Sequence, residues 1–595
     1  MTFGPTAHYS LGLALLTDGY RLEAIRALDN SIMLDPGFSN AYRTRGLAFA
    51  MGGDYDRAAK DLRALVALDT KDVNAVVQLG VDFGKASRER QAGRLFQVAA
   101  EMAPDVALPQ YIYGHFLINH RMFEKGMGFV ERAMKIDPLV SDHYVARGFG
   151  HMGQGRIEDA VADFRRANEL APHSAEVAGS LLFALQHKPG VTRTELLHEH
   201  KRWAALHRPD QPRERYSFAN DADPQRRLRL GIVSADMHSH AVTFLSLPAF
   251  ESLSAMGYEI YCYKTDRKQE DDRFSERFKA AAKSWLDVSD LDDAAFAAQI
   301  EKDRIDVLFD MAGHTAGNRL GVFARRAAPI QLTWAGYVGT IGLDTCDGII
   351  ADPVEIPSGE EQDYAEPVLR MPDCYVSYLP PREPPDVTPL PCLDTGHFTF
   401  GCFNRPAKVN EAVAAAWARI LREVPGSRML MVYGGLDEKS TQDQLLGVLA
   451  RGGFPVNRID LIGDSTQADL LVRYGEVDLA LDPFPYSGGV TTLEGMWMGV
   501  PSVTWRGETF AGRHASSHMT AAGLPEFCAD DVDGYVALAV SWANRRDELA
   551  EVRRALRDRV GNSPLCDAPR FADNLSREMM RRWQDWCDGR RKAAA

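Results

Sequence analysis

The first third of the chain repeats itself every 34 residues, and this period constrains the fold more than any other feature. Three columns of residues share it: Gly12, Gly46, Gly80, Gly114 and Gly148; Ala24, Ala58, Ala92, Gly126 and Ala160; Pro36, Thr70, Pro104, Pro138 and Pro172. Small residues let two helices touch, and a proline ends a helix. The pattern predicts stacked pairs of antiparallel helices, with a generic helical bundle as the alternative.

The 34-residue spacing is similar to that of tetratricopeptide repeats, of which five would fill residues 5–174. Solenoids of this kind present a concave surface that grips extended peptides. We therefore expect a protein partner or a protein acceptor held by the repeats.

Length and composition limit the function classes. The chain has 595 residues, which exceeds a single core, so three or four domains are expected. A formal net charge of −14 argues against nucleic acid as the main partner, because nucleic-acid binders usually carry a basic face. The sequence contains no run of eighteen apolar residues and no secretory signal pattern at its start, so we expect no membrane span and a cytoplasmic location.

The eight cysteines all lie beyond residue 261, and none forms a C-x-x-C motif. This spacing indicates neither a disulfide framework nor a zinc ribbon. We expect reduced and mostly buried thiols.

After the repeats, the runs SAEVAGSLLFALQ and TRTELLHEHKRWAALH predict two further helices, a helical cap followed by a linker over residues 175–226. Apolar strand-like runs then alternate with helical stretches in two blocks, residues 227–385 and residues 386–595, the second ending in a helical tail. Such alternation predicts an α/β fold with two Rossmann-like domains, each a parallel sheet covered by helices. The carboxyl ends of both sets of strands should converge on a cleft.

Residues 478–501, DLALDPFPYSGGVTTLEGMWMGVP, carry the pattern of a phosphate-binding turn. Gly488 and Gly489 let backbone N–H groups approach an anion, and the helix that follows offers unpaired donors, a positive dipole end and the hydroxyl groups of Thr491 and Thr492. An ordinary strand–turn–helix corner would use the same residue types. The motif nevertheless favours a site for a nucleotide or a phosphorylated sugar.

Several separate motifs resemble one family. LRLGIVSADMHSH, IDVLFDMAGHTAGNRLGVFARRAAPIQLTWAGYVGTIG, FGCFNRPAKV, LALDPFPYSGGVTTLEGMWMGVPSVTWRGETFAGR and SPLCDAPRF, in this order behind the repeats, resemble the SPINDLY-like and O-linked N-acetylglucosamine transferase group, glycosyltransferase family 41. The resemblance implies a GT-B fold and inverting transfer of a sugar from a nucleotide diphosphate to Ser or Thr of proteins. It implies no metal ion and no cofactor besides the donor, the nucleotide sugar.

The resemblance also implies roles for individual residues. Lys408 matches the lysine that contacts the donor pyrophosphate, and a lysine beside a helix N-terminus can offset the charge that develops on the leaving phosphate. The remaining residues assigned to the donor are Arg405, Gly489, Val490, Thr491 and Thr492 around the diphosphate, Glu494 at the ribose hydroxyls and Arg473 beside the base.

His240 matches an active-site histidine near the acceptor, and we expect His314 to face the cleft from the end of a strand in the first α/β block. Both are treated as candidate catalytic residues, although a lone histidine is often structural. Asp303 and Asp306 lie near a position assigned to proton transfer in the family, but ordinary helix-end charge is the better explanation for both.

Three positions depart from the family pattern. Leu470 stands where a nucleotide-contacting histidine is usual, Arg405 replaces a polar residue and Val490 replaces a threonine. The group uses both UDP-N-acetylglucosamine and GDP-fucose, and GETFAGR favours the former for this chain. The alternatives are O-fucosyl transfer from GDP-fucose, transfer to a non-protein acceptor, and a nucleotide-binding interaction scaffold without turnover.

Overall fold

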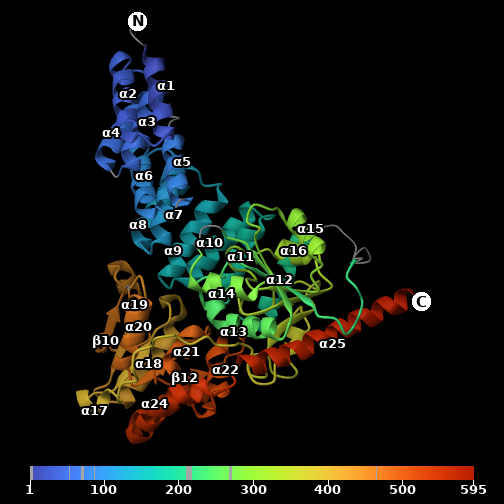
Figure 1. The fold of residues 1–595 in the computed structure, drawn as a ribbon. Helices are drawn as coiled ribbons and strands as arrows, with labels where there is room; N and C mark the ends of the chain where they lie inside the picture. The colour runs from blue at the N-terminus through green and yellow to red at the C-terminus, as the bar shows by residue number, and fades with distance from the viewer. Residues whose placement is uncertain are drawn as a thin grey trace. The chain divides into compact units, whose positions relative to one another are not determined.

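The computed structural model describes residues 4–52, 54–68, 73–85, 88–208, 218–266, 271–463 and 465–594. The chain divides into two compact units, Met1–Gly150 and His151–Ala595 (Figure 1). Each unit has hydrophobic clusters of its own.

Helices fill the first unit, and they repeat in pairs. Their bounds are α1 Pro5–Thr17, α2 Arg21–Leu34, α3 Ser39–Met51, α4 Tyr55–Leu68, α5 Val73–Lys85, α6 Glu89–Met102, α7 Ala107–Asn119, α8 Phe123–Ile136 and α9 Ser141–Gly153, of which the last three residues belong to the second unit. Equivalent helices begin 34 residues apart, as the positions of α1, α3, α5, α7 and α9 show. The predicted helix-pair repeat is confirmed, while Thr70 lies outside the described residues.

The recurring glycines mark the places where the two helices of a pair touch. A Cβ atom on Gly12 would lie 2.7 Å from Leu28 Cγ, and one on Gly80 would lie 2.5 Å from Phe96 Cε1. In the fourth repeat, a Cβ atom on Gly114 would lie 2.7 Å from the carbonyl oxygen of Gly126, and the reverse contact is equally short. The period seen in the sequence therefore records helix-to-helix contact.

The second unit begins with helices and continues into a first α/β domain. The helices α10 Ile157–Leu170, α11 Ala175–Leu185 and α12 Arg193–His207 precede a seven-stranded parallel sheet of order β3-β2-β1-β4-β5-β6-β7. Its strands are β1 Arg229–Ser234, β2 Glu259–Lys264, β3 Ser284–Asp287, β4 Val307–Asp310, β5 Ile330–Thr333, β6 Gly348–Ala351 and β7 Val368–Arg370, and its helices are α13 Ala241–Ala255, α14 Arg273–Ala281, α15 Asp293–Asp303 and α16 Leu320–Ala324.

A second α/β domain follows, with a six-stranded parallel sheet of order β10-β9-β8-β11-β12-β13. Its strands are β8 Thr399–Cys402, β9 Arg428–Val432, β10 Ile459–Ile462, β11 Leu479–Leu481, β12 Ser502–Trp505 and β13 Cys528–Ala529. Its helices are α17 Cys392–Thr395, α18 Glu411–Glu423, α19 Lys439–Arg451, α20 Gln467–Arg473, α21 Val490–Trp497, α22 His514–Ala521, α23 Val532–Asn544 and α24 Arg546–Gly561. The fold prediction, a helical solenoid followed by two Rossmann-like domains, is confirmed.

The end of the chain departs from the predicted division at residue 386. The last helix, α25 Ala568–Ala594, runs back along the first α/β domain, where it packs on α13 (Figure 1). Its buried residues Leu575, Met579 and Trp583 belong to the hydrophobic cluster of the first sheet. The apolar stripe of α25 is thus buried against strands that precede it by more than 200 residues, a pairing that no local pattern reveals.

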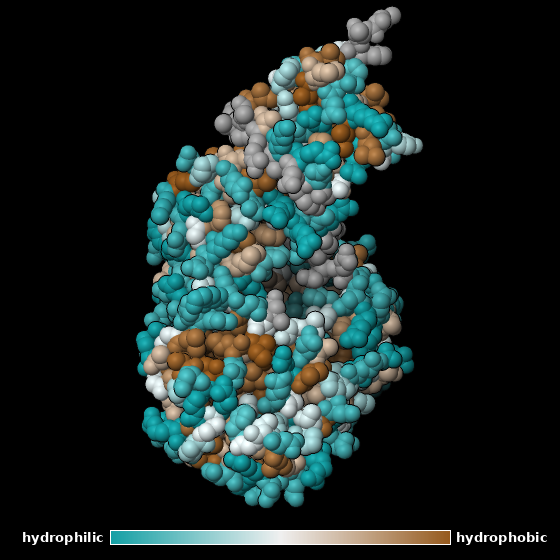
Figure 2. Space-filling model, turned by 90° about the vertical axis from the view of Figure 1, so that its left-hand side faces the viewer, coloured by the Kyte–Doolittle hydropathy of each residue, from teal (hydrophilic) through white to brown (hydrophobic). Residues whose placement is uncertain are grey.

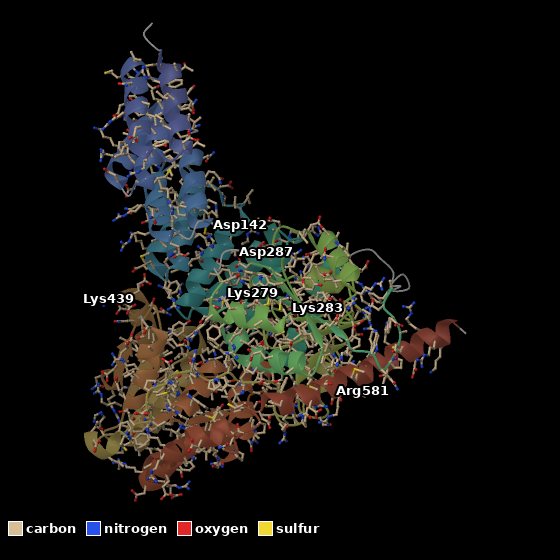
Figure 3. The ribbon with its side chains drawn as sticks, in the orientation of Figure 1. Asp142, Lys279, Lys283, Asp287, Lys439 and Arg581 are labelled. Carbon is tan, nitrogen blue, oxygen red and sulfur yellow. The ribbon has the colours of Figure 1, made fainter. Side chains whose placement is uncertain are left out.

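Charged side chains on the surface tend to meet a partner of opposite sign. Among the residues labelled in Figure 3, Lys279 pairs with Asp271, Lys439 with Asp443 and Arg581 with Glu578. Most of the face in Figure 2 is hydrophilic, with one broader hydrophobic area. Within the described residues, none of the helices combines the length and the apolar character that crossing a membrane demands. All eight cysteines are free and six are buried, as expected.

The close crossing in the fourth repeat gives a stability prediction. We expect Gly126→Ala to destabilise helices α7 and α8 by about 2 kcal/mol, because the new Cβ atom would meet the backbone of Gly114 and Ile118. The matched control is Gly128→Ala on the same helix, where a Cβ atom meets nothing within 4 Å and the better helix propensity should stabilise slightly. Amide hydrogen exchange of α7 and α8 in the full chain measures both effects, and equal protection in the two variants would contradict the prediction.

Candidate donor site at the second switch point

The second sheet reverses its strand order between β8 and β11, and ligands of open parallel sheets bind beyond the strand ends at such a point. The chain leaving β8 forms residues 403–408, which end in a short 3₁₀ turn at Lys408. The chain leaving β11 forms the Pro-rich segment and the two glycines before α21. The predicted phosphate turn and the predicted lysine therefore lie on neighbouring strand ends.

A buried carboxylate holds the glycine turn in place. Asp482 is only 3 % exposed and accepts hydrogen bonds from Gly488 N at 2.6 Å and from Thr504 Oγ1 at 2.8 Å. Position 488 has no room for a side chain, because a Cβ atom would lie 2.6 Å from Thr492 Oγ1 and 3.1 Å from Asp482 Oδ1. The Asp482 carboxylate thus fixes the turn, and position 488 requires glycine because Thr492 and Asp482 lie too close for a Cβ atom.

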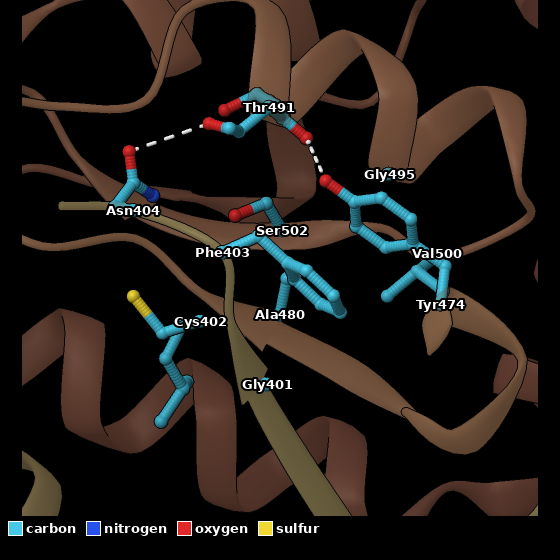
Figure 4. Close-up of a pocket in the computed structure, with 12 residues that line it drawn as sticks. Gly401, Cys402, Phe403, Asn404, Tyr474, Ala480, Thr491, Gly495, Val500 and Ser502 are labelled. Atoms are coloured by element: carbon cyan, nitrogen blue, oxygen red, sulfur yellow. Dashed lines mark hydrogen bonds between the residues drawn. The ribbon is translucent and has the colours of Figure 1, made fainter. Parts of the chain in front are cut away.

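At the start of helix α21, backbone N–H groups have no hydrogen-bond acceptor among the described residues. Gly489 is its N-cap and provides no side-chain cap, and the part of the chain that the structure describes supplies no acceptor for the N–H groups of Gly489, Val490 and Thr491. Thr491 Oγ1 donates to Asn404 Oδ1 at 3.3 Å, which links the turn to the loop after β8 (Figure 4). Free N–H groups and the positive end of the helix dipole form an anion-binding site.

Lys408 completes this anion site. Its Nζ atom donates to Ser487 O at 2.6 Å and to Asn404 Oδ1 at 3.1 Å, and it lies 4.2 Å from the centre of the Tyr486 ring. Burial lowers the pKa of Lys408, the positive charge of Arg405 lowers it further, and the Asp482 carboxylate opposes both effects. Arg405 itself is exposed, so a second cation stands beside the lysine. An incoming anion would relieve the desolvated charge.

A small cavity of about 10 Å³, lined by residues of β8, β11 and α21, lies beside the site (Figure 4). Asn404 and Thr491 form part of its wall, and Tyr474 OH donates to Thr491 O at 2.9 Å across it. The cavity holds about one water molecule. The cavity is therefore too small to hold a nucleotide.

The residues assigned to the nucleoside lie on α20 and α21. Glu494 is 5 % exposed and accepts a hydrogen bond from Gln467 Nε2 at 3.1 Å, and burial raises its pKa to about 7. Arg473 pairs with Glu476 at 2.7 Å near the surface. Leu470 packs beside the Phe403 cluster and offers no polar group to a nucleotide.

His240 caps helix α13 after β1. Its Nδ1 atom accepts a hydrogen bond from Val242 N at 3.3 Å and lies 3.6 Å from Asp236 Oδ2. Burial, with the charges of His238 and Arg405, lowers the pKa of His240 to about 4, so the ring is neutral near pH 7. A neutral ring that accepts at Nδ1 carries its proton on Nε2. His240 is therefore arranged to donate a hydrogen bond, and Asp236 is the nearest carboxylate.

His314 differs from its prediction. Its ring is 4 % exposed and lies 4.6 Å from the Trp203 ring and 5.1 Å from the His200 ring, and Nε2 lies 2.9 Å from Ile341 O. The ring thus packs beneath helix α12 rather than facing the cleft. The prediction used only the position of His314 at the end of a strand. It could not anticipate that α12 of the helical cap covers this edge of the sheet.

The two carboxylates considered for proton transfer are structural. Asp303 accepts from Tyr263 OH at 2.8 Å. Asp306 is fully buried and accepts from Arg229 N at 2.8 Å and from Asn220 Nδ2 at 2.6 Å. Both lie before β4, at the amino ends of the strands, whereas ligands bind at the carboxyl ends.

Sequence reasoning missed three residues that contact the site. Asp482 supports the turn, and the ring of Tyr486 lies against Lys408. His187, from the segment after α11, contacts Tyr486 with tilted rings whose centres are 4.5 Å apart. Asp482 and Tyr486 were inside the quoted motif, but their roles depend on side-chain direction. For His187 the sequence carried no signal.

The chain is similar to known proteins over both α/β domains. The model of glycosyltransferase family 41 matches residues 161–377 and 392–575. A probable UDP-N-acetylglucosamine–peptide N-acetylglucosaminyltransferase, SPINDLY of Petunia hybrida, is 35% identical over 378 residues, which are 63% of this chain and 40% of that protein. The SPINDLY protein of Arabidopsis thaliana is 33% identical over 424 residues, 71% of this chain and 46% of that protein. The chain thus spans less than half the length of these relatives.

Among solved structures, a mutant of the Thermobaculum terrenum O-GlcNAc transferase superposes with a TM-score of 0.82 at 29% identity, covering 89% of this chain and 99% of that one. The family match spans both α/β domains, including the strand ends that carry Lys408 and the glycine turn. The chain belongs to glycosyltransferase family 41.

Proposed function

We propose that the protein transfers a sugar from a nucleotide diphosphate to Ser or Thr hydroxyl groups of proteins, with inversion at the sugar carbon. One observation carries the proposal: Lys408 and the open first turn of α21 form one anion site at the strand ends of a Rossmann-like domain. The names of the relatives favour UDP-N-acetylglucosamine as the donor and peptides as acceptors. GDP-fucose is the alternative donor.

The site residues perform the electrostatic part of the reaction. When the bond between the sugar carbon and the phosphate oxygen breaks, negative charge grows on the diphosphate, and Lys408, Arg405 and the N–H groups of α21 offset it. The attacking hydroxyl group approaches from the side of the first domain, where His240 Nε2 donates a hydrogen bond. The proton of the attacking hydroxyl group passes to water or to a nearby carboxylate. Asp236 is the carboxylate nearest to His240. We propose that no metal ion or further cofactor takes part.

We further propose that the repeats of the first unit bind the protein acceptor. Every residue proposed above to bind the nucleotide sugar lies in the second unit, so the repeats are left for another ligand. An enzyme for a non-protein acceptor, or a scaffold without turnover, would use the repeats only for assembly. Incubation of the full chain with radiolabelled nucleotide sugars and cell lysate, followed by gel separation, tests all three possibilities.

Lys408→Ala should lower transfer about a hundredfold, since one preorganised charge contact with a developing anion is worth about 3 kcal/mol. Lys439→Ala is the matched control, because this lysine is exposed on α19 and pairs with Asp443. Initial rates of protein labelling compare the two variants with the parent chain. Parental activity in a folded Lys408→Ala protein would refute the assignment.

Gly488→Ala should weaken the binding of UDP and GDP by about tenfold or more, because the added methyl group displaces Thr492 or Asp482 and distorts the turn. Gly447→Ala on α19 serves as control, since its Cβ atom would make only an ordinary contact with the flexible end of Arg451. Isothermal titration calorimetry measures both. Unchanged affinity in Gly488→Ala would show that the turn does not hold the diphosphate.

Removal of the first two repeats, so that the chain begins with α5 at Val73, should leave nucleotide binding and donor hydrolysis unchanged and strongly reduce protein labelling. Calorimetry with UDP and GDP beside the labelling assay separates the two effects. Labelling at the full rate would assign the removed repeats to assembly or localisation instead.

A further inference from the structure

The segment after α11 reaches the donor site from the helical cap. Gln186 Nε2 donates to Tyr337 OH at 3.2 Å, and Tyr337 belongs to the loop that follows β5 in the first α/β domain. The ring of the next residue, His187, lies against Tyr486 at a tilt of 32°, and Tyr486 belongs to the loop that follows β11 in the second domain. Residues 186 and 187 therefore lie where strand-end loops of both domains meet.

The hydrogen bonds of His187 define its tautomer. Nδ1 lies 3.2 Å from Phe183 O, a carbonyl that can only accept, so the proton of the neutral ring is on Nδ1. Nε2 then carries a lone pair. His187 is only 3 % exposed, and the described residues supply no partner for its Nε2 atom. Nε2 is nevertheless not fully enclosed, in contrast to both nitrogens of the buried His518 ring. Nε2 is thus an acceptor without a partner at the edge of a buried side chain.

The surroundings keep this acceptor neutral. Burial lowers the pKa of His187 to about 3, and the positive charges of Lys408 and Arg405 contribute to the lowering. The ring of His514 also borders Tyr486, with ring centres 6.0 Å apart, and burial lowers its pKa as well. A neutral acceptor beside two cations does not repel a diphosphate as a carboxylate would.

The position of His187 relative to the anion site indicates its ligand. In a nucleotide sugar the diphosphate separates the nucleoside from the sugar. The nucleoside residues proposed above, Glu494 and Arg473, lie on α21 and α20, whereas His187 lies on the Tyr486 side of Lys408, beside a loop of the first domain. The group next to His187 in a bound donor is then the sugar, whose hydroxyl groups are hydrogen-bond donors.

We propose that His187 Nε2 accepts a hydrogen bond from a hydroxyl group of the transferred sugar, so that the helical cap takes part in selecting the donor. The inference rests on the proposed function, because it requires a nucleotide sugar at the Lys408 site. It assigns His187 to sugar recognition and leaves the chemistry of bond breaking to the residues described above. Nothing in the sequence motifs points to this residue.

The experiment compares affinities for free nucleotides and for nucleotide sugars. His187→Phe keeps an aromatic ring against Tyr486 and removes the acceptor, and His187→Gln retains an acceptor oxygen. Calorimetry with UDP, GDP, UDP-N-acetylglucosamine and GDP-fucose is carried out on the full chain and on both variants. His198→Phe is the control, because this histidine is exposed on α12 of the same helical pair.

We expect His187→Phe to bind the nucleotide sugar about tenfold more weakly and the free nucleotide diphosphate with unchanged affinity, as the loss of one hydrogen bond predicts. His187→Gln should recover part of the difference. In the parent chain, one donor analogue that lacks a single sugar hydroxyl should bind as weakly as the complete donor binds to His187→Phe, and the variant should not distinguish the two.

If His187→Phe binds the free nucleotide and the nucleotide sugar with equally reduced affinity, His187 only supports the fold. If both affinities are unchanged, His187 does not contact the sugar. Either result overturns this inference and leaves the proposed function untouched. Failure of the parent chain to bind any of the four compounds would overturn the proposed function together with it. If His187→Phe does not fold, the analogue series on the parent chain and on His187→Gln decides, since indifference to the loss of each hydroxyl contradicts the inference.

Discussion

The candidate donor site depends on the hydrogen bonds and the charge of the buried Asp482 carboxylate. This carboxylate binds the N–H group of Gly488 and the hydroxyl group of Thr504, and it lies close enough to Lys408 to oppose the lowering of the lysine pKa by burial. Burial in turn raises the pKa of Asp482, and the lysine counteracts this rise. Removing either partner would leave an uncompensated buried charge, which is costly. The glycine turn, the lysine and the start of α21 are thus one structural unit.

A second set of charges ties the helical cap to both α/β domains. Arg193 at the start of α12 contacts Glu360 at 2.8 Å and Asp363 at 2.9 Å in the first domain, and it donates to the carbonyl oxygen of Glu508 in the second. Glu360 also accepts from Arg513 at 2.6 Å. Bidentate and shared contacts of this kind fix orientation as well as charge. They hold α11 and α12 against the two α/β domains, so that the segment carrying His187 is placed by the same contacts that join these domains.

The sequence predictions were accurate where a feature depends on neighbouring residues, and they failed where it depends on segments far apart in the chain. The two parallel sheets were predicted because an apolar run between turn residues, such as the runs that form β2 and β9, is a local pattern. The edge strands β3, β7 and β13 carry little pattern of their own, because each has only two to four residues. His314 was expected to face the cleft, but α12 covers it, and the cover comes from a segment more than 100 residues earlier in the chain.

The sequence by itself determined the helix-pair repeat, the two parallel sheets and the glycine turn, since period, strand–helix alternation and turn chemistry depend on residues close together in the chain. The assignment of Lys408 came from the resemblance to a known family. Only the tertiary structure decided that α25 completes the core of the first domain, that Asp482 supports the turn, and that His187 lies against Tyr486. The physical reason is the same in each case. Which buried faces and charges meet is settled by the packing of distant segments, and the direction of a side chain is fixed only when its neighbours are in place.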